Sequence, residues 1–506
     1  MLQKQTKSHN FEQNDFDVAI VGAGINGAVA AAAAQAAGLR VLIIDRGDFA
    51  NFTSQESSNL VWGGIKYLQT YEFALVAKLC QARNRLIRAY PNQIQEIGFL
   101  ASLGPNAPFG RLLGIFGTWF YWFIGTAGTT IPASYSAKRA KSMEPALKSG
   151  LKAVEYFDAY LPDNDSRFVY GFIKRAKKLG ATALNYTELV GASHESGRWS
   201  LELSSAEGKR TVSASAVINA AGPFAQDVSQ LLESPTRARL VFSKGVHFTI
   251  NRRLTSQNRV LALWDEQKRL FYVLPMGDRS IIGTTDTRVD NPRTEPNDQD
   301  IDFVLKQVND QLGLEQPITR QEIIASRSGV RPLVIDGKQS QNQDWHQLSR
   351  KHVIEANPAK ASITILGGKL TDCLNVGAEV IAELRGLGLQ AKLPRKWFGE
   401  GSQARRTELD QILERQGVDA VVRTRLVEGM WRRHGERAFE FATDEPVEVF
   451  EGLGISFGEL RYVAKTEDVL TREDLLRRRL PIAMSRSAAE IAENSKLQSA
   501  LVDMGL

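Results

Sequence analysis

The sequence is poor in cysteine. Of its 506 residues only Cys80 and Cys373 are cysteines, and they lie far apart without a C-x-x-C pair. Disulfide frameworks and cysteine zinc sites need more thiols at closer spacing. We therefore expect a cytoplasmic protein with no disulfide and no metal site.

Long hydrophobic runs are missing as well. No stretch reaches the roughly 18 to 20 apolar residues that span a membrane, and the start of the chain, MLQKQTKSHNFEQNDF, lacks the apolar core of a signal peptide. The nearest candidate is 112–126, LLGIFGTWFYWFIGT. Its length and its Trp and Tyr content suit either a buried helix or a helix in a membrane interface, so peripheral membrane contact and plain core packing both stay open.

Nucleic-acid-binding motifs, internal repeats and low-complexity segments are absent too, so we do not expect a nucleic-acid partner. The 63 Lys and Arg residues exceed the 57 Asp and Glu residues by only six and are dispersed among them. This balance suits a small anionic substrate or an anionic membrane surface, and it is equally typical of a solvated surface of mixed charge. The length predicts two or three domains.

What the sequence does contain is a dinucleotide-binding pattern at residues 17–45, DVAIVGAGINGAVAAAAAQAAGLRVLIID. Two apolar runs flank a glycine turn and a small-residue helix, which predicts strand, turn, helix and strand. Gly22, Gly24 and Gly27 have the G-x-G-x-x-G spacing that allows a tight turn, close approach of backbone to a pyrophosphate, and close helix packing. The helix N-terminus would hold the pyrophosphate, and Asp45 would accept hydrogen bonds from the ribose.

Other regions have different patterns. The polar loop 47–68 contains Gly63 and Gly64, which permit close approach of the backbone to a ligand; the alternative is a solvated connection. Residues 239–283 contain several strand-like runs, which predict a mostly antiparallel sheet separate from the first. Beyond residue 394 only helical patterns remain. We thus expect an α/β fold with a second, antiparallel domain and a small all-α C-terminal domain.

Eight short segments carry a resemblance to a known family. In chain order they are VGAGINGAVAAAAA, TSQESSNLVWGGIKYL, INAAGPF, SKGVHF, IIGTTDT, SGVRPL, LGGKLT and GELRYVAKTEDVLTREDLLRRR. In this order and spacing they resemble the FAD-dependent glycerol-3-phosphate dehydrogenase family, which belongs to the glutathione-reductase-like and D-amino-acid-oxidase-like flavoproteins. The resemblance implies FAD as cofactor and oxidation of sn-glycerol 3-phosphate to dihydroxyacetone phosphate. Hydride would pass from C2 to flavin N5, and the electrons would go on to a quinone.

The resemblance also implies that the Rossmann-like FAD-binding domain is assembled from three parts of the chain. We predict these parts at 1–90, 151–235 and 351–392, a substrate and membrane-contact segment at 91–150, the antiparallel substrate domain at 236–350, and the helical domain at 393–506.

Cofactor-binding residues follow from the matched motifs. Those matching the family's contacts to the ADP half, the pyrophosphate and ribityl chain, and the flavin are Gly22, Gly24, Gly27, Asp45, Thr53, Ser54, Ser57, Ser58, Leu189, Ala221, Gly222, Gly367, Gly368, Lys369 and Leu370, beside the loop glycines Gly63 and Gly64. The helix that opens at 367–370 would aim its positive end at the flavin and stabilise the anionic reduced form.

Substrate-binding residues are implied in the same way. Arg331 and Lys369 match residues that contact the substrate, Lys66 and Tyr67 occupy the phosphate positions, and His247 matches the histidine of a K-G-x-H motif. A guanidinium suits a phosphate or a developing alkoxide, and an imidazole suits proton transfer near neutral pH, so His247 is the candidate general base. The alternatives are a structural histidine in a strand and an Arg331 salt bridge at the turn before Pro332.

Four positions depart from the family pattern. Asn59, Trp62 and Lys66 stand where the family has Lys, His and Arg, and Leu374 replaces an arginine. Lys66 keeps the charge but loses the bidentate fork. The substrate could therefore be another hydroxy acid, a polyol phosphate or an amine, and a further alternative is a non-catalytic flavoprotein that acts as a sensor.

Overall fold

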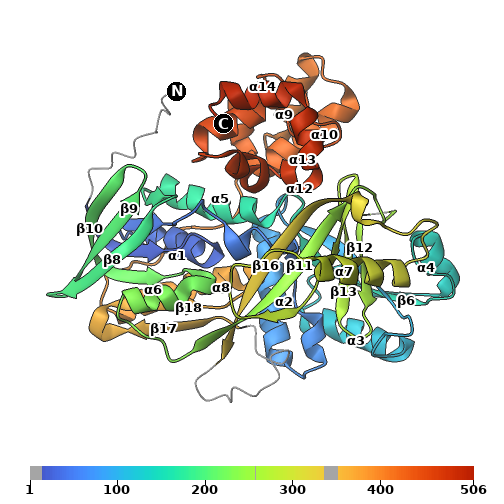
Figure 1. The fold of residues 1–506 in the computed structure, drawn as a ribbon, viewed down its shortest axis with the longest axis horizontal. Helices are drawn as coiled ribbons and strands as arrows, with labels where there is room; N and C mark the ends of the chain where they lie inside the picture. Colours follow the sequence, from blue (N-terminus) through green and yellow to red (C-terminus); the bar gives the residue numbers. More distant parts are fainter. Residues whose placement is uncertain (1–13, 257, 336–350) are drawn as a thin grey trace.

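The computed structural model describes residues 14–256, 258–335 and 351–506. Over these ranges the chain forms two β-sheets and a helical C-terminal domain (Figure 1). This confirms the expected fold class. The predictions for residues 1–13 and 336–350 concern segments outside the described ranges.

The first sheet is organised around β1, as the glycine motif predicts. β1 runs parallel to β2 and β10, with Val18 opposite Val41 and Ala216. Helix α1 connects β1 to β2 and is buried along nearly its whole length, which its alanines permit because small side chains allow close packing. The strand order is β17-β18-β10-β1-β2-β7; β9 also pairs with β10, and β8 pairs with β9. The strands are β1 (Asp15–Val21), β2 (Val41–Ile44), β7 (Thr182–Leu184), β8 (Glu188–Glu195), β9 (Arg198–Ser205), β10 (Gly208–Asn219), β17 (Val353–Asn357) and β18 (Ser362–Leu366), and the helices beside them are α1 (Ile25–Ala36), α5 (Asp165–Lys178), α6 (Ala225–Leu231) and α8 (Cys373–Gly386).

The second sheet is mostly antiparallel, as expected. β11 and β16 pair along almost their full length, and the only parallel pair among its described strands is β12 with β4. The strands are β3 (Leu60–Val61), β4 (Gln95–Ser102), β5 (Ala133–Tyr135), β6 (Ala153–Tyr160), β11 (Arg239–Ile250), β12 (Arg259–Trp264), β13 (Leu270–Met276), β14 (Arg279–Gly283), β15 (Thr287–Val289) and β16 (Ile323–Ile335), accompanied by α2 (Phe73–Ala89), α3 (Arg111–Ile124), α4 (Ala137–Met143) and α7 (Asp298–Gln311).

Strand β6 shows where the predicted domain limits differ from the sheets. The sequence places 151–235 in the FAD-binding domain. In the structure, however, β6 pairs with β4 in the second sheet, where Tyr160 lies opposite Gln95 and Ala153 lies opposite Ser102. The short strand β3, within 1–90, also pairs with β6. The chain therefore leaves the second sheet after β6 and not at residue 151. The sequence could not show this, because strand partners so far apart leave no local signal.

Helix α3 confirms a helix at 112–126 but not its burial in a core. Only Gly114, Thr118 and Tyr121 are buried. The exposed large side chains are Leu112, Leu113, Phe116, Trp119 and Phe123. None of the helices in the described ranges has both the length and the apolar character needed to cross a bilayer.

The C-terminal domain is built from helices joined by loops and lies against α5 and β16 (Figure 1). Its helices are α9 (Arg406–Arg415), α10 (Ala420–His434), α11 (Phe457–Thr466), α12 (Ile482–Ser485), α13 (Ala488–Glu493) and α14 (Ser495–Asp503), with a single π-helical stretch, η9 (Asp474–Arg479). Two apolar clusters inside it, around Met430 and around Leu460, give the domain its own core.

Candidate functional site

Two cavities lie side by side where the sheets meet. The first, of about 510 Å³, opens at the carboxyl ends of β1, β2 and β10, and the second, of about 620 Å³, lies between the loop 53–72 and the second sheet. Both sizes are typical of ligand sites. Ile25, Thr53, Ser54, Pro332 and Gly368 line both cavities, so an elongated ligand could extend from one into the other.

The glycine turn has the geometry that the motif predicts. Gly22 has a φ of +99°, and a Cβ there would lie 2.6 Å from the carbonyl oxygen of Ala220. A Cβ on Gly27 would overlap the carbonyl oxygen of Gly22, so α1 packs directly on the turn. Gly24 lines the first cavity, where Ser54 Oγ accepts a hydrogen bond of 3.0 Å from the Ile25 backbone. The turn leaves room at the start of α1 for an anion.

Asp45 lies at the end of β2 and lines the first cavity. Its carboxylate accepts hydrogen bonds from the backbone nitrogens of Ala23 (2.7 Å) and Gly47 (2.9 Å), while burial raises its pKa. Each carboxylate oxygen can accept more than one hydrogen bond, so the ribose role predicted for Asp45 remains sterically available.

Most of the predicted cofactor residues line these cavities. The first is lined by Gly22, Gly24, Asp45, Thr53, Ser54, Leu189, Ala221, Gly222, Gly367 and Gly368, and the second by Thr53, Ser54, Ser57, Ser58, Gly368, Lys369 and Leu370. Residues more than 300 positions apart in sequence are thus brought to one continuous site.

Gly63 and Gly64 line neither cavity. The Gly63 nitrogen donates to Asp158 Oδ1 (3.1 Å), and a Cβ on Gly63 would overlap the hydroxyl of Tyr121. Gly64 has a φ of +85°. The structure therefore gives both glycines a packing role against α2 and α3.

Positive side chains converge on the second cavity. Lys66, Arg331 and Lys369 all line it. Arg331 Nη2 donates to Thr284 Oγ1 (3.1 Å), and its Nη1 lies 3.6 Å from Asp286 Oδ1. Lysine and arginine at one wall suit a phosphate or carboxylate, and Asp286 offsets part of their charge.

Aromatic rings form another wall of the second cavity. Lys369 Nζ lies 4.1 Å from the ring centre of Tyr67 and 5.8 Å from that of Trp62. The rings of Trp62 and Tyr67 are themselves 5.9 Å apart. Trp62, one of the departures from the family pattern, thus lines the second cavity beside the lysine.

His247 is placed apart from the cavities. It lies on β11 opposite Gly283 and Arg327, is buried, and lines neither cavity. Neither ring nitrogen has a hydrogen-bond partner among the described residues. Burial lowers its pKa well below the ordinary value, and the charges of Arg331 and Arg327 add to this effect. The imidazole is therefore neutral at pH 7.

Two further residues that depart from the family pattern, Asn59 and Leu374, are buried. Leu374 lies in the apolar core around α8. Asn59 accepts a hydrogen bond of 2.9 Å from Arg327, which also donates to the Ser57 carbonyl (2.7 Å). A guanidinium from β16 thus lies beside Asn59, where the family has a lysine.

Sequence reasoning missed several residues of the second cavity. Among them are Gln69, Glu72, Trp264, Arg269, Tyr272, Thr284 and Asp286. The IIGTTDT segment, which contains Thr284 and Asp286, was a signal that could have identified two of them. No cluster of metal-ligating side chains occurs in the part of the chain that the structure describes.

Comparison with known proteins places this geometry in context. Residues 17–354 match the family model "DAO: FAD dependent oxidoreductase". The chain is 29% identical over 505 residues to D-erythritol 1-phosphate dehydrogenase of Brucella abortus, covering 95% of this chain and 97% of that protein. It is 27% identical to the mitochondrial glycerol-3-phosphate dehydrogenase of Macaca fascicularis, covering 85% of this chain and 61% of that longer protein. The structure of the Bacillus halodurans glycerol-3-phosphate dehydrogenase complexed with FAD superposes with a TM-score of 0.72 at 22% identity, over 98% of this chain and 91% of that one.

Proposed function

We propose, from the premise that this chain belongs to the family of FAD-dependent oxidoreductases, that it oxidises a secondary alcohol of a small polyol phosphate. The predicted cofactor, FAD, is the one that defines the family. The observation that carries the substrate class is the second cavity, where Lys66, Arg331 and Lys369 converge next to a dinucleotide site.

The chain's own residues have distinct roles in this proposal. FAD, when bound, supplies the two-electron acceptor. Gly22, Gly24 and Asp45 would hold its adenosine and pyrophosphate, since they line the first cavity. Arg331 and Lys369 would hold the substrate phosphate and orient the reacting carbon, because fixed donors in a partly dry site lower the cost of reaching the transition state.

His247 remains the proposed proton acceptor. Its lowered pKa keeps the imidazole neutral, as an acceptor requires. Its ring lies outside both cavities, whereas Thr284 follows its pairing partner Gly283 and lines the second cavity. We propose that the Thr284 hydroxyl, just beyond β14, takes the proton of the substrate hydroxyl and passes its own proton on to His247.

Glycerol 3-phosphate and a longer polyol phosphate are the two candidate substrates. The matched motifs and the mitochondrial relatives favour sn-glycerol 3-phosphate. The full-length similarity to an erythritol-phosphate dehydrogenase favours a four-carbon substrate.

A kinetic comparison separates the two substrates. We expect turnover with at least one of sn-glycerol 3-phosphate and D-erythritol 1-phosphate, using an artificial electron acceptor and measuring kcat/KM for each. A ratio of the two kcat/KM values of about tenfold or more would identify the preferred substrate, since one or two good polar contacts produce a difference of this size. Bound flavin without turnover of either compound would contradict the proposal and favour the non-catalytic sensor.

We further propose that a membrane quinone accepts the electrons and that α3 contacts the membrane. Three aromatic rings extend the exposed apolar face of α3. The ring centre of Phe120 on α3 lies 5.5 Å from that of Phe73, and the ring centre of Phe73 lies 6.0 Å from that of Tyr71. Tyr71 is 78% exposed. It lies between Thr70 and Glu72, which line the second cavity. This apolar surface thus extends to the rim of the substrate site.

Replacing Leu112, Phe116 and Phe123 by serine should abolish vesicle binding. Their side chains are 85%, 67% and 76% exposed, and each apolar side chain buried in lipid contributes about 1.5 to 3 kcal/mol. The triple variant should therefore lose at least about a hundredfold in affinity for vesicles containing anionic lipid, measured by sedimentation. The matched control replaces the exposed Val421, Val447 and Val502, which lie in the C-terminal domain. Equal sedimentation of both variants and the wild type would refute membrane contact through α3.

A further inference from the structure

The C-terminal domain reaches the cofactor loop through three consecutive arginines. Arg477, Arg478 and Arg479 end the π-helical stretch η9. All three side chains contact acceptors in the loop 48–58. That loop carries Thr53, Ser54, Ser57 and Ser58, which line the two cavities. The function proposed above gives these arginines no role.

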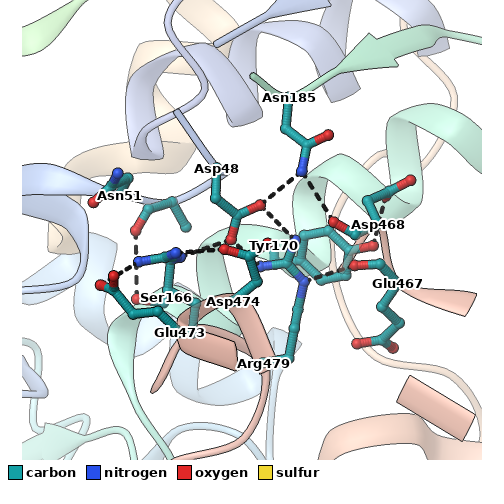
Figure 2. A network of polar contacts seen from close by, with 12 residues as sticks. Asp48, Asn51, Ser166, Tyr170, Asn185, Glu467, Asp468, Glu473, Asp474 and Arg479 are labelled. Carbon is teal, nitrogen blue, oxygen red and sulfur yellow. Dashed lines mark hydrogen bonds and ion pairs between the residues drawn. The ribbon is translucent and has the colours of Figure 1, made fainter. Parts of the chain in front are cut away.

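The first attachment is a buried cluster around Asp48. Figure 2 shows this carboxylate facing Arg479, which donates to both of its oxygens at 2.8 Å. Arg478 Nε donates to Asp48 Oδ2 at 2.7 Å, and Asn185 Nδ2 to Oδ1 at 3.0 Å. The Arg479 guanidinium also stacks 3.9 Å from the ring centre of Tyr170 on α5. Charge pairs this well satisfied fix the start of the loop to the C-terminal domain.

The second attachment lies at the far end of the loop. Arg478 Nη1 donates to Gln55 Oε1 (2.9 Å), and Arg477 Nη2 lies 2.8 and 2.9 Å from the two oxygens of Glu56. Glu56 also accepts a hydrogen bond of 3.1 Å from the Ser328 backbone on β16. Glu56 therefore joins the loop to both the C-terminal domain and the second sheet.

We propose that the C-terminal domain is part of the cofactor site and that Arg477 is a positioning residue acting through Glu56, a role that rests on FAD being the cofactor. Glu56 directly precedes Ser57 and Ser58, which line the second cavity, but it lines neither cavity itself. A loop that is already ordered before binding loses less conformational entropy when the ligand binds, so the ligand binds more tightly. Loss of the Arg477–Glu56 contact would release the 56–58 segment, whose Ser57 and Ser58 line the second cavity.

The Arg477–Glu56 pair is the suitable place for a test. Its side chains are 18% and 10% exposed, whereas Asp48 and Arg479 are fully buried, and removing either of those would leave an uncompensated buried charge that endangers folding. The experiment uses the full chain as wild type, Arg477→Ala, Glu56→Ala and the double variant. The control is Arg472→Ala, since Arg472 donates hydrogen bonds to Gln498 Oε1 (3.0 Å) and the Leu506 carbonyl (3.1 Å), both within the C-terminal domain.

Three quantities are measured: the FAD dissociation constant, the visible circular dichroism of bound flavin, and the Tm of the apoprotein. We expect each single variant to bind FAD at least tenfold more weakly with altered visible circular dichroism, and the apoprotein Tm to change little. The double variant should be no worse than the singles, because both residues act through one contact. Arg472→Ala should match the wild type.

Two results would overturn the positioning role. One is unchanged FAD affinity and circular dichroism with a lowered Tm, which would make the pair a stabilising contact only. The other is an additive loss in the double variant, which would show that the two residues act independently. A wild type that takes up no FAD would instead contradict the proposed cofactor itself, before any variant is compared.

Discussion

Arg331→Ala should retain its flavin and lose about a hundred- to a thousandfold in kcat/KM. The guanidinium lines the second cavity and is held by Thr284 at 3.1 Å with Asp286 nearby, so it is oriented before the substrate arrives. Losing charge-assisted hydrogen bonds to a phosphate in such a site removes about 3 to 4 kcal/mol of transition-state stabilisation. Stopped-flow reduction of the bound flavin by substrate measures this loss directly.

Two companion variants make the result specific to Arg331. Arg331→Lys should recover part of the rate, since lysine keeps the charge without the fork. Arg269→Ala should cost less than about tenfold, because Arg269 lines the same cavity but is tied to Asp265 at 2.7 Å. If Arg331→Ala instead lost its flavin together with soluble protein, the alternative of a structural salt bridge would hold.

Gly27→Ala should give a protein without detectable FAD and with unfolding free energy lowered by about 3 kcal/mol or more. The added Cβ would overlap the carbonyl oxygen of Gly22, a backbone atom that cannot move without displacing the turn. Such overpacking separates α1 from β1 and destroys the anion site at the helix start. Flavin absorbance per protein and urea unfolding measure the two effects.

The matched control is Gly171→Ala on α5. A Cβ at Gly171 meets no atom within 4 Å, so the change removes only the helix cost of glycine and should stabilise by up to about 1 kcal/mol. A Gly27→Ala protein with full flavin content and unchanged stability would contradict the packing geometry of the turn.

The local parts of this fold could be predicted from sequence. The segment 17–45 forms β1, α1 and β2 as expected, because periodicity and glycine spacing act within a few residues. The C-terminal helices follow for the same reason. The sheet that β6 joins could not be predicted, because its partner β4 is set by packing between distant segments and not by the pattern of β6 itself.

The candidate site was predicted mainly from sequence motifs, and a motif does not specify the three-dimensional position of a side chain. Motifs selected Arg331 and Lys369, which line the second cavity, and also His247, which is buried and lines neither cavity. A motif does not specify which face of β11 a side chain occupies relative to a cavity. The arginines at 477–479 were part of a matched segment, yet their contacts with Asp48 and Glu56 depend on the docking of a whole domain.

The most direct test of the central claim is an anaerobic visible spectrum of the purified protein before and after a phosphorylated polyol is added. Flavin absorbance that bleaches with sn-glycerol 3-phosphate or D-erythritol 1-phosphate, but not with glycerol or erythritol, is the expected result. It would show an FAD-dependent dehydrogenase that needs the phosphate of its substrate, the group that Arg331 and Lys369 are proposed to hold. Bleaching by the unphosphorylated polyols at equal rates, or no bleaching by any of the four, would contradict the account.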